Sequence, residues 1–143
     1  MLATANSLWT LLNFSTMKPA NPSAEHLTKY PVEPKLDMAY AGRKITVGAG
    51  GAAQEPVIIR KQHLDSNNHV NNGQYINIAS DYLPEGFEVH QIRAEYKKQA
   101  LLGDVIVPKV LVADQVCIVV LCNKEDQVYA TVEFRTERQR EKE

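Results

Sequence analysis

The sequence is poor in the features that define secreted and membrane-bound proteins. It has two cysteines, one tryptophan and no apolar stretch that approaches the length of a membrane-spanning helix. Two cysteines cannot supply the disulfide framework of a small secreted domain. The N-terminus also lacks the positively charged segment and apolar run of a signal peptide. The sequence therefore predicts a cytoplasmic protein without a membrane partner.

Net charge is small as well. The 143 residues carry 16 basic and 17 acidic side chains, which gives a formal net charge of −1. No basic stripe is interleaved with aromatic residues, as would be typical of a surface that binds a phosphate backbone. We therefore expect no nucleic-acid partner. Apolar residues make up 44% of the chain, so we expect it to bury a core and to fold over most of its length.

The two cysteines lie close together in the sequence. Cys117 falls within the apolar run 116–121, and Cys122 directly follows that run. In a strand, an odd separation places two side chains on opposite faces of the sheet. The two thiols cannot then bridge each other, and we expect both to be reduced, with at least one of them in the core.

The first 60 residues are interrupted by proline and glycine. Ser23 is positioned to cap a short helix, because a serine oxygen accepts hydrogen bonds from the N–H groups of a first helical turn. Pro31 and Pro34 favour an extended linker that runs to about residue 40. The expected elements are a strand over 2–16, a turn-rich break over 17–22, the helix over 23–29, a short strand over 44–47, a flexible glycine-rich loop over 48–51 and a strand over 57–60.

A helix and four strands are predicted in the remainder of the chain. Apolar residues recur at helical spacing up to a stop at 84–86, namely Tyr75, Ile76, Ala79, Tyr82 and Leu83. Strands are expected over 87–98, 104–113, 115–123 and 127–136. The last alternates, with Val128, Ala130, Val132 and Phe134 on one face and Tyr129, Thr131, Glu133 and Arg135 on the other. This order predicts an α+β fold in which a long central helix is wrapped by a curved antiparallel sheet.

Polar residues gather immediately before the predicted helix. Asp65, Asn67 and His69 occupy alternate positions, which an extended chain would align on one side and a loop would draw closer together. Histidine is the natural proton shuttle near neutral pH. The N–H groups and positive dipole end of the following helix suit an oxygen that becomes anionic when a thioester carbonyl is attacked. The cluster is therefore a candidate catalytic site.

Other roles are open to the same segment. Asn71 or Asn72 is a natural helix cap, because asparagine is among the residues that best satisfy the first N–H groups of a helix. A metal site formed by His63, Asp65 and His69 is conceivable, although it lacks a recognised ligand spacing.

Two further kinds of site find no support in the sequence. A calcium loop fails, since Val70 stands where such a loop needs glycine and Ile76 stands where it needs glutamate. The sequence also contains neither a Gly-x-Ser-x-Gly nucleophile elbow nor a phosphate-binding loop. We expect no metal and no cofactor.

The string Leu64-Asp65-x-Asn67-x-His69-Val70-Asn71-Asn72-x-x-Tyr75 resembles the signature of the plant and bacterial acyl-acyl carrier protein thioesterases. Residues 92–105 are similar to the family's strand after the central helix, and residues 5–13 resemble the closing strand of the first of its two fused hotdog domains. The resemblance implies a hotdog thioesterase domain over 41–143. It also implies that residues 1–40 are the terminal strand and linker of a preceding hotdog domain.

The resemblance implies a hydrolase of fatty acid synthesis that releases free fatty acid from an acyl carrier protein bearing a fatty acyl chain. Water would attack the thioester. Asp65 would orient the site, Asn67 would position the thioester or the water, and His69 would act as acid and base. The family's matching positions also imply a catalytic place for residue 99 and substrate-binding roles for Val70, Asn71, Asn72 and Tyr75.

One position departs from the family pattern. The family has a catalytic glutamate, often followed by cysteine, where this chain has Gln99 and Ala100. A glutamine can orient water but cannot accept a proton, and Ala100 excludes a cysteine nucleophile there. The alternatives are therefore a catalytically weak or inactive acyl-binding or dimerisation module, or a single-hotdog acyl-CoA thioesterase that acts as a homodimer. Pairing with an N-terminal hotdog domain remains a further expectation.

Overall fold

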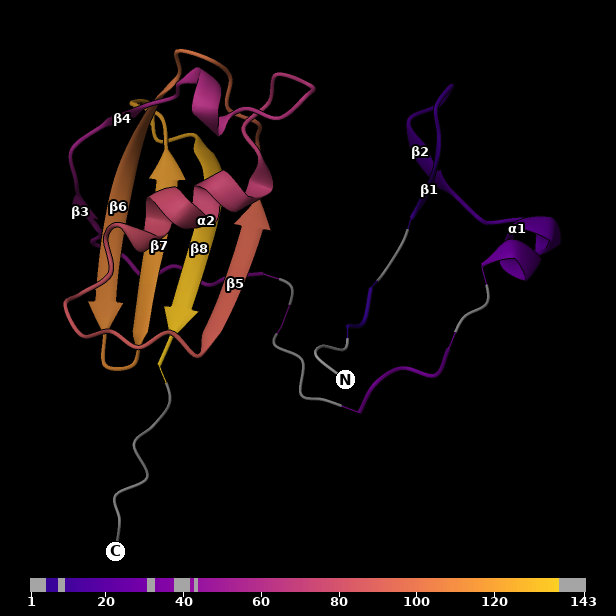
Figure 1. Ribbon diagram of the computed structural model, residues 1–143, viewed down its shortest axis with the longest axis horizontal. Helices are drawn as coiled ribbons and strands as arrows, with labels where there is room; N and C mark the ends of the chain where they lie inside the picture. Colours follow the sequence, from indigo (N-terminus) through magenta and orange to yellow (C-terminus); the bar gives the residue numbers. More distant parts are fainter. Residues whose placement is uncertain (1–4, 8–9, 31–32, 38–41, 43, 137–143) are drawn as a thin grey trace, which may run out of the picture. The chain divides into compact units, whose positions relative to one another are not determined.

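The computed structural model describes residues 5–7, 10–30, 33–37, 42 and 44–136, which fall into two compact units, Met1–Ala41 and Gly42–Glu143 (Figure 1). In the first unit, β1 (Leu11–Asn13) and β2 (Lys18–Ala20) form an antiparallel hairpin. The helix α1 (Ala24–Lys29) follows, and Ser23 caps it as predicted, with its side chain accepting from the N–H of His26. Residues 33–37 have no regular structure.

The hairpin corrects two predictions for this unit. The strand expected over 2–16 is limited to three residues in its described part, and β2 lies inside the break expected over 17–22. Residues 2–4, 8 and 9 of that strand, and 31, 32 and 38–40 of the linker, lie outside the described residues. The chain reverses because the Asn13 side chain accepts from the N–H groups of Ser15 and Thr16, and Met17 adopts a left-handed φ of 54°.

An antiparallel sheet forms most of the second unit (Figure 1). Its order in the described part of the chain is β3-β6-β7-β8-β5, and β4 pairs with β6 along the same edge as β3. The strands are β3 (Ala52–Ala53), β4 (Val57–Ile58), β5 (Gln91–Tyr96), β6 (Val105–Ala113), β7 (Val116–Cys122) and β8 (Val128–Arg135). The four strands predicted after the helix are thus confirmed as β5 to β8, with ends displaced by up to a few residues.

The core lies between this sheet and α2 (Asn72–Ser80), which covers β7 and β8 on one face (Figure 1). Side chains alternate between the two faces of a strand, so every second residue of the two central strands points to the helix. These residues are fully buried, because removal of apolar surface from water is favourable. They are Cys117, Val119 and Leu121 from β7 and Ala130, Val132 and Phe134 from β8, which pack with Tyr75, Ile78 and Ala79 of α2. The sequence thus predicted that a helix packs on an antiparallel sheet.

The helix is shorter than predicted. It has nine residues and ends at Ser80, so the expected long central helix is not present in the described chain. Beyond Ser80 the backbone hydrogen bonds span three residues instead of four. The N–H of Tyr82 donates to the carbonyl of Ala79, and the N–H of Leu83 donates to the carbonyl of Ser80. Pro84 disfavours a helical conformation for the residue before it. Tyr82 and Leu83 still pack against the core, which is why the apolar periodicity continues beyond the end of the helix.

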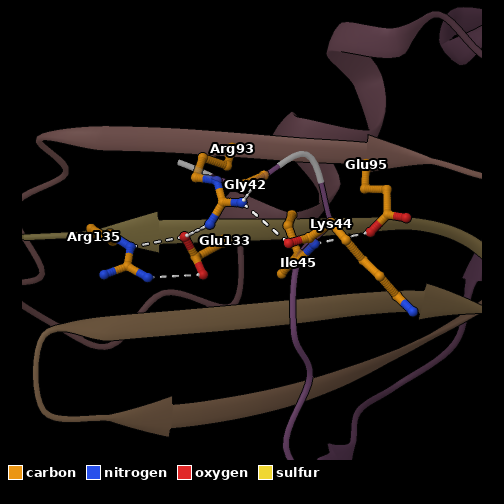
Figure 2. Close-up of polar contacts among 7 residues, drawn as sticks. All are labelled: Gly42, Lys44, Ile45, Arg93, Glu95, Glu133 and Arg135. Carbon is orange, nitrogen blue, oxygen red and sulfur yellow. Dashed lines mark hydrogen bonds and ion pairs between the residues drawn. The ribbon is translucent and has the colours of Figure 1, made fainter. Parts of the chain in front are cut away.

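The outer face of the sheet is covered by Gly42 and residues 44–51, here called the outer strap. The strand predicted over 44–47 is wrong, because the backbone of the outer strap bonds to side chains of β5 and not to another strand. Figure 2 shows the Arg93 guanidinium donating to the carbonyls of Gly42 and Lys44, while the N–H of Ile45 donates to Glu95 at 3.2 Å. Ile45 is the buried residue of the outer strap, in contrast to its exposed neighbours Lys44 and Thr46.

A buried carboxylate lies on this outer face. Glu133 of β8 pairs with Arg93 at 2.9 Å and with Arg135 at 2.8 Å (Figure 2), and it is only 4% exposed. Hydrogen bonds from Arg135, and then from Arg93, hold the pKa of this carboxyl below its ordinary value. The sequence placed Glu133 on the second face of β8, but it did not indicate that this face is covered.

A bulge in β8 breaks the predicted alternation of that strand. Leu121 pairs with Ala130 and Cys122 pairs with Val128, so Tyr129 is an extra residue without a partner in the register. Val128 consequently lies on the outer face beside Cys122, and not with Ala130 as predicted.

The two cysteines lie on opposite faces of β7, as predicted. Cys117 belongs to the core beneath α2, whereas Cys122 lies on the outer face and donates its S–H to the carbonyl of Val107. Both are free and buried, and burial raises the pKa of each thiol. Neither thiol is therefore a ready nucleophile. The described residues include no helix long and apolar enough to cross a membrane.

Candidate active site

The turn at 65–69 is closed by Asp65. Its Oδ1 accepts from the N–H of Asn67 at 2.8 Å and from the N–H of His69 at 3.2 Å. Its own N–H donates to the carbonyl of His69 at 2.8 Å, and Asn68 supplies the left-handed residue of the turn, with φ of 60°. The loop therefore draws the three predicted catalytic residues together, where an extended chain would have spread them out.

This turn stands on a short antiparallel stem. Leu64 forms a bridge with Val70, and the N–H of Asn71 donates to the carbonyl of His63 at 3.0 Å. Val70 is buried in the core below the stem. Above it, Asp65 and His69 are half-buried and Asn67 is exposed. The stem thus fixes the turn to the core while leaving its polar side chains partly or fully exposed.

The two asparagines after the stem begin the helix. Asn71 is the N-cap of α2, with its Oδ1 accepting from the N–H of Gly73 at 2.8 Å, so the capping interpretation is confirmed for this residue. Its carbonyl accepts from the N–H of Gln74. Asn72 is the first helical residue, and its carbonyl accepts from the hydroxyl of Tyr96 at 3.1 Å. Much of the first turn's hydrogen-bonding capacity is therefore satisfied inside the protein.

The segment that carries Gln99 lies directly against this stem. The N–H of Val70 donates to the carbonyl of Ala100 at 3.2 Å, and the N–H of Ala100 donates to the Tyr75 hydroxyl at 2.8 Å. Gln99 itself is exposed, whereas Ala100 is completely buried. The structure therefore brings two segments separated by thirty residues of sequence, those of His69 and Gln99, to one place.

Tyr129 and Asp104, which the sequence did not indicate as part of the site, hold the far side of this segment. The Tyr129 carbonyl accepts from the N–H groups of Lys97 and Lys98, so the bulge in β8 receives both. Asp104 accepts from the N–H of Leu101 at 2.9 Å and from the Tyr129 hydroxyl at 3.2 Å. Burial, followed by the nearby Asp104 charge, raises the pKa of Tyr129 to about 12. An aspartate after glycine in a turn was the available signal for Asp104, while nothing local indicated Tyr129.

The metal-site interpretation gains no geometric support. The described part of the chain contains no group of three or more histidine, cysteine, aspartate or glutamate side chains that could hold a metal ion. The Nδ1 atom of His63 instead accepts from the N–H of Arg60 at 3.0 Å.

Comparison with known families assigns this domain to one of them. A family-wide sequence profile described as "Acyl-ACP thioesterase C-terminal domain" matches residues 51–140. The chain belongs to this family. The match spans the turn at 65–69, all of α2 and Gln99, so the candidate site lies wholly within the acyl-ACP thioesterase C-terminal domain. A comparison with curated proteins gave no match.

Solved structures agree on the fold of this acyl-ACP thioesterase domain. An acyl-ACP thioesterase from Bacteroides thetaiotaomicron VPI-5482 has a TM-score of 0.71 and 18% identity, over 88% of this chain and 53% of that chain. The 12:0-ACP thioesterase from Umbellularia californica has a TM-score of 0.62 and 19% identity, over 87% and 52%. A putative oleoyl thioesterase from Lactobacillus plantarum has a TM-score of 0.62 and 21% identity, over 90% and 55%.

These likenesses show the fold: an antiparallel α+β architecture with hotdog-type thioesterases as its structural neighbours. The chain spans about half the length of the solved chains that it matches.

Proposed function

We propose that this domain hydrolyses fatty acyl thioesters of acyl carrier protein and releases free fatty acid. The observation that carries the proposal is the hydrogen bond from Val70 to Ala100, which joins the Asp65–His69 turn to the segment of Gln99. A site built from two distant segments, with its polar residues accessible and its backbone buried, is the arrangement that a preorganised catalyst needs.

The roles follow from the chemistry of each side chain. The His69 imidazole takes a proton from water as the water oxygen bonds to the thioester carbon, and it returns the proton to the thiolate as the carbon–sulfur bond breaks. Asn67, which is exposed, donates from its amide to the carbonyl oxygen that becomes negative. Gln99 orients the water, and Asp65 keeps the turn closed.

The four proposed substrate-binding residues differ in how far their side chains are exposed. Asn71 and Asn72 lie at the exposed start of α2, where the helix dipole favours negative charge. Val70 and Tyr75 are 3% and 2% exposed, which favours an indirect role for their side chains.

The direct test is hydrolysis by the purified chain. Acyl carrier protein loaded with a series of saturated acyl groups, and the matching acyl-CoA esters, would be assayed by release of free thiol. Replacement His69→Ala should lower kcat by about 100-fold or more, because general acid–base catalysis contributes that much. His90→Ala, which removes an exposed histidine outside the site, serves as the control. No hydrolysis of any substrate, or a His69→Ala rate equal to that of the wild type, would contradict the proposal.

A catalytically weak or inactive acyl-binding module is the second candidate, and Gln99 is the observation that favours it. The amide cannot accept a proton, so water activation rests on His69 alone. The variant Gln99→Glu distinguishes the two. A large gain in kcat would mean that the natural site is weak, whereas an unchanged kcat would mean that the amide suffices. Gln62→Glu adds the same charge on the neighbouring exposed 3-10 helix Lys61–His63 and controls for a general electrostatic effect.

The partners are proposed on the same basis. Within the described sheet β5 is an edge strand, and it exposes Ile92 and Tyr96 at 48% and 41%. An unpaired apolar edge favours pairing, either with a preceding hotdog domain or with a second copy of this chain. Sedimentation of the purified chain tests self-pairing, and a monomer at all concentrations would leave the preceding domain as the proposed partner. We place the reaction in the cytoplasm.

A further inference from the structure

Two consecutive peptide groups next to Gln99 are each held by hydrogen bonds to other parts of the domain. The N–H of Ala100 belongs to the planar group that also contains the carbonyl of Gln99, and it donates to Tyr75. The next planar group contains the carbonyl of Ala100 and the N–H of Leu101, which are bonded to Val70 and to the Asp104 carboxylate. Fixing both planes leaves the backbone at residues 99–101 little freedom.

Within the described part of the chain, the Tyr75 hydroxyl is the side-chain group that bonds to the first of these planes, and its own position is tightly set. Tyr75 lies in the first half of α2 and is almost completely buried in the core. Its ring packs against that of Tyr96, with 5.9 Å between ring centroids and 56° between ring planes. The Tyr96 hydroxyl in turn bonds to Asn72 at the start of the same helix. The hydroxyl of Tyr75 is therefore held at a fixed place relative to the helix and the turn before it.

We propose that Tyr75 is a positioning residue, whose hydroxyl sets the peptide plane between Gln99 and Ala100 and so aims the Gln99 amide at the catalytic turn. This inference rests on the proposed thioesterase function. Tyr75 touches neither water nor substrate in this role, and it acts only through Gln99. Phenylalanine at this position would keep the ring packing and remove only the acceptor of the Ala100 N–H.

The kinetic test compares Tyr75→Phe with Tyr82→Phe. The second variant removes a hydroxyl that bonds to the carbonyl of Glu55, away from the Gln99 segment. Tyr75→Phe should lower kcat roughly 10-fold to 100-fold, the range expected when a catalytic group is misplaced by about an ångström, with KM nearly unchanged. Tyr82→Phe should leave both constants within about twofold. An unchanged kcat for Tyr75→Phe would overturn the proposal.

A double-mutant cycle then asks whether Tyr75 acts through Gln99. In a Gln99→Ala background the amide to be aimed is gone, so Tyr75→Phe should cause no further loss of kcat. A full additional loss in that background would show that Tyr75 supports activity by another route, and it would also overturn the proposal.

A measurement without turnover separates this inference from the proposed function. In the full chain, NMR should show faster hydrogen exchange at the Ala100 amide and shifted Gln99 side-chain amide signals in Tyr75→Phe, with exchange at Val132 of the core unchanged. If the wild type proves inactive, the proposed function fails while this measurement still decides the positioning. Unaltered Ala100 exchange and Gln99 signals would reject the positioning even in an active enzyme.

Discussion

Single residues at this site combine a proposed role in the reaction with a role in stabilising the local fold. The family resemblance implies an orienting role for Asp65 and substrate-binding roles for Asn71 and Tyr75, yet each side chain accepts a hydrogen bond from a backbone N–H. His69 is half-buried and Ala100 is buried, so an N–H left without a partner there is unfavourable, and Asn71 caps the first turn of α2. These side chains therefore support the local fold whatever else they do. Loss of activity in a variant of any of them is therefore informative only beside a measurement of stability.

Substitutions of Asp65 can separate its stabilising hydrogen bonds from the effect of its charge. Asparagine retains an Oδ1 acceptor for the N–H groups of Asn67 and His69, whereas alanine has none. Asp65→Ala should lower the free energy of unfolding by about 1–3 kcal/mol, and Asp65→Asn should lower it much less. Urea unfolding followed by circular dichroism measures both. Equal losses for the two variants would mean that the charge, and not the turn, stabilises this segment.

The elements show where sequence patterns are reliable and where they fail. Strands β5 to β8 were predicted because their apolar runs are long and bounded by turns. The end of α2 was misjudged because Tyr82 and Leu83 keep contact with the core after the helix stops, so periodicity alone could not locate Ser80. The side of Val128 was misjudged because a bulge leaves no local signature in composition.

The same limit applies to the site. The turn at 65–69 and the cap at Asn71 were predictable, since each uses hydrogen bonds between near neighbours in sequence. The contact of Val70 with Ala100, and that of Tyr129 with the segment 97–104, join residues far apart and depend on how the whole sheet is assembled. Family resemblance supplied position 99, which local physics could not have singled out.

The start of α2 gives a prediction at this scale. Asn71→Ala removes the oxygen that accepts from the N–H of Gly73 and should lower the free energy of unfolding by about 1 kcal/mol. Asn77→Ala is a matched control, because Asn77 is exposed inside the same helix, where alanine is the more favourable residue. Thermal or urea unfolding compares the two. A larger loss for Asn77→Ala would show that the cap contributes little.

At the scale of the domain, the sheet is covered on both faces: α2 lies on one side and the outer strap crosses the other. The second covering depends on polar contacts, since Arg93 links the outer strap to Glu133 of β8 (Figure 2). A buried carboxylate between two guanidinium groups is favourable only while it is charged. The attachment of the outer strap is therefore sensitive to acid.

The pKa of Glu133 determines how the free energy of unfolding changes with pH. The pKa of Glu133 is lowered in the folded protein from an ordinary value of 4.5, first by Arg135 and then by Arg93. Its contribution to stability is therefore fully present above pH 4.5 and is lost as the pH falls below 4.5 through the folded value. Glu133→Gln should flatten the fall in the free energy of unfolding over that acid range. Glu125→Gln, in the exposed turn between β7 and β8, removes an acidic side chain outside the Glu133 ion pairs and serves as the matched control.

The fixing of residue 99 by its neighbours' backbone has a consequence for how this domain can be altered. Gln99 is exposed, and the bonds that locate it belong to Ala100 and Leu101. Exchanging its side chain for any residue other than proline leaves those bonds intact, and surface exchanges usually change stability by no more than about 0.5 kcal/mol. A saturation library at this one codon would therefore present acids, amides, thiols and amines to the proposed thioester substrate on an unchanged scaffold.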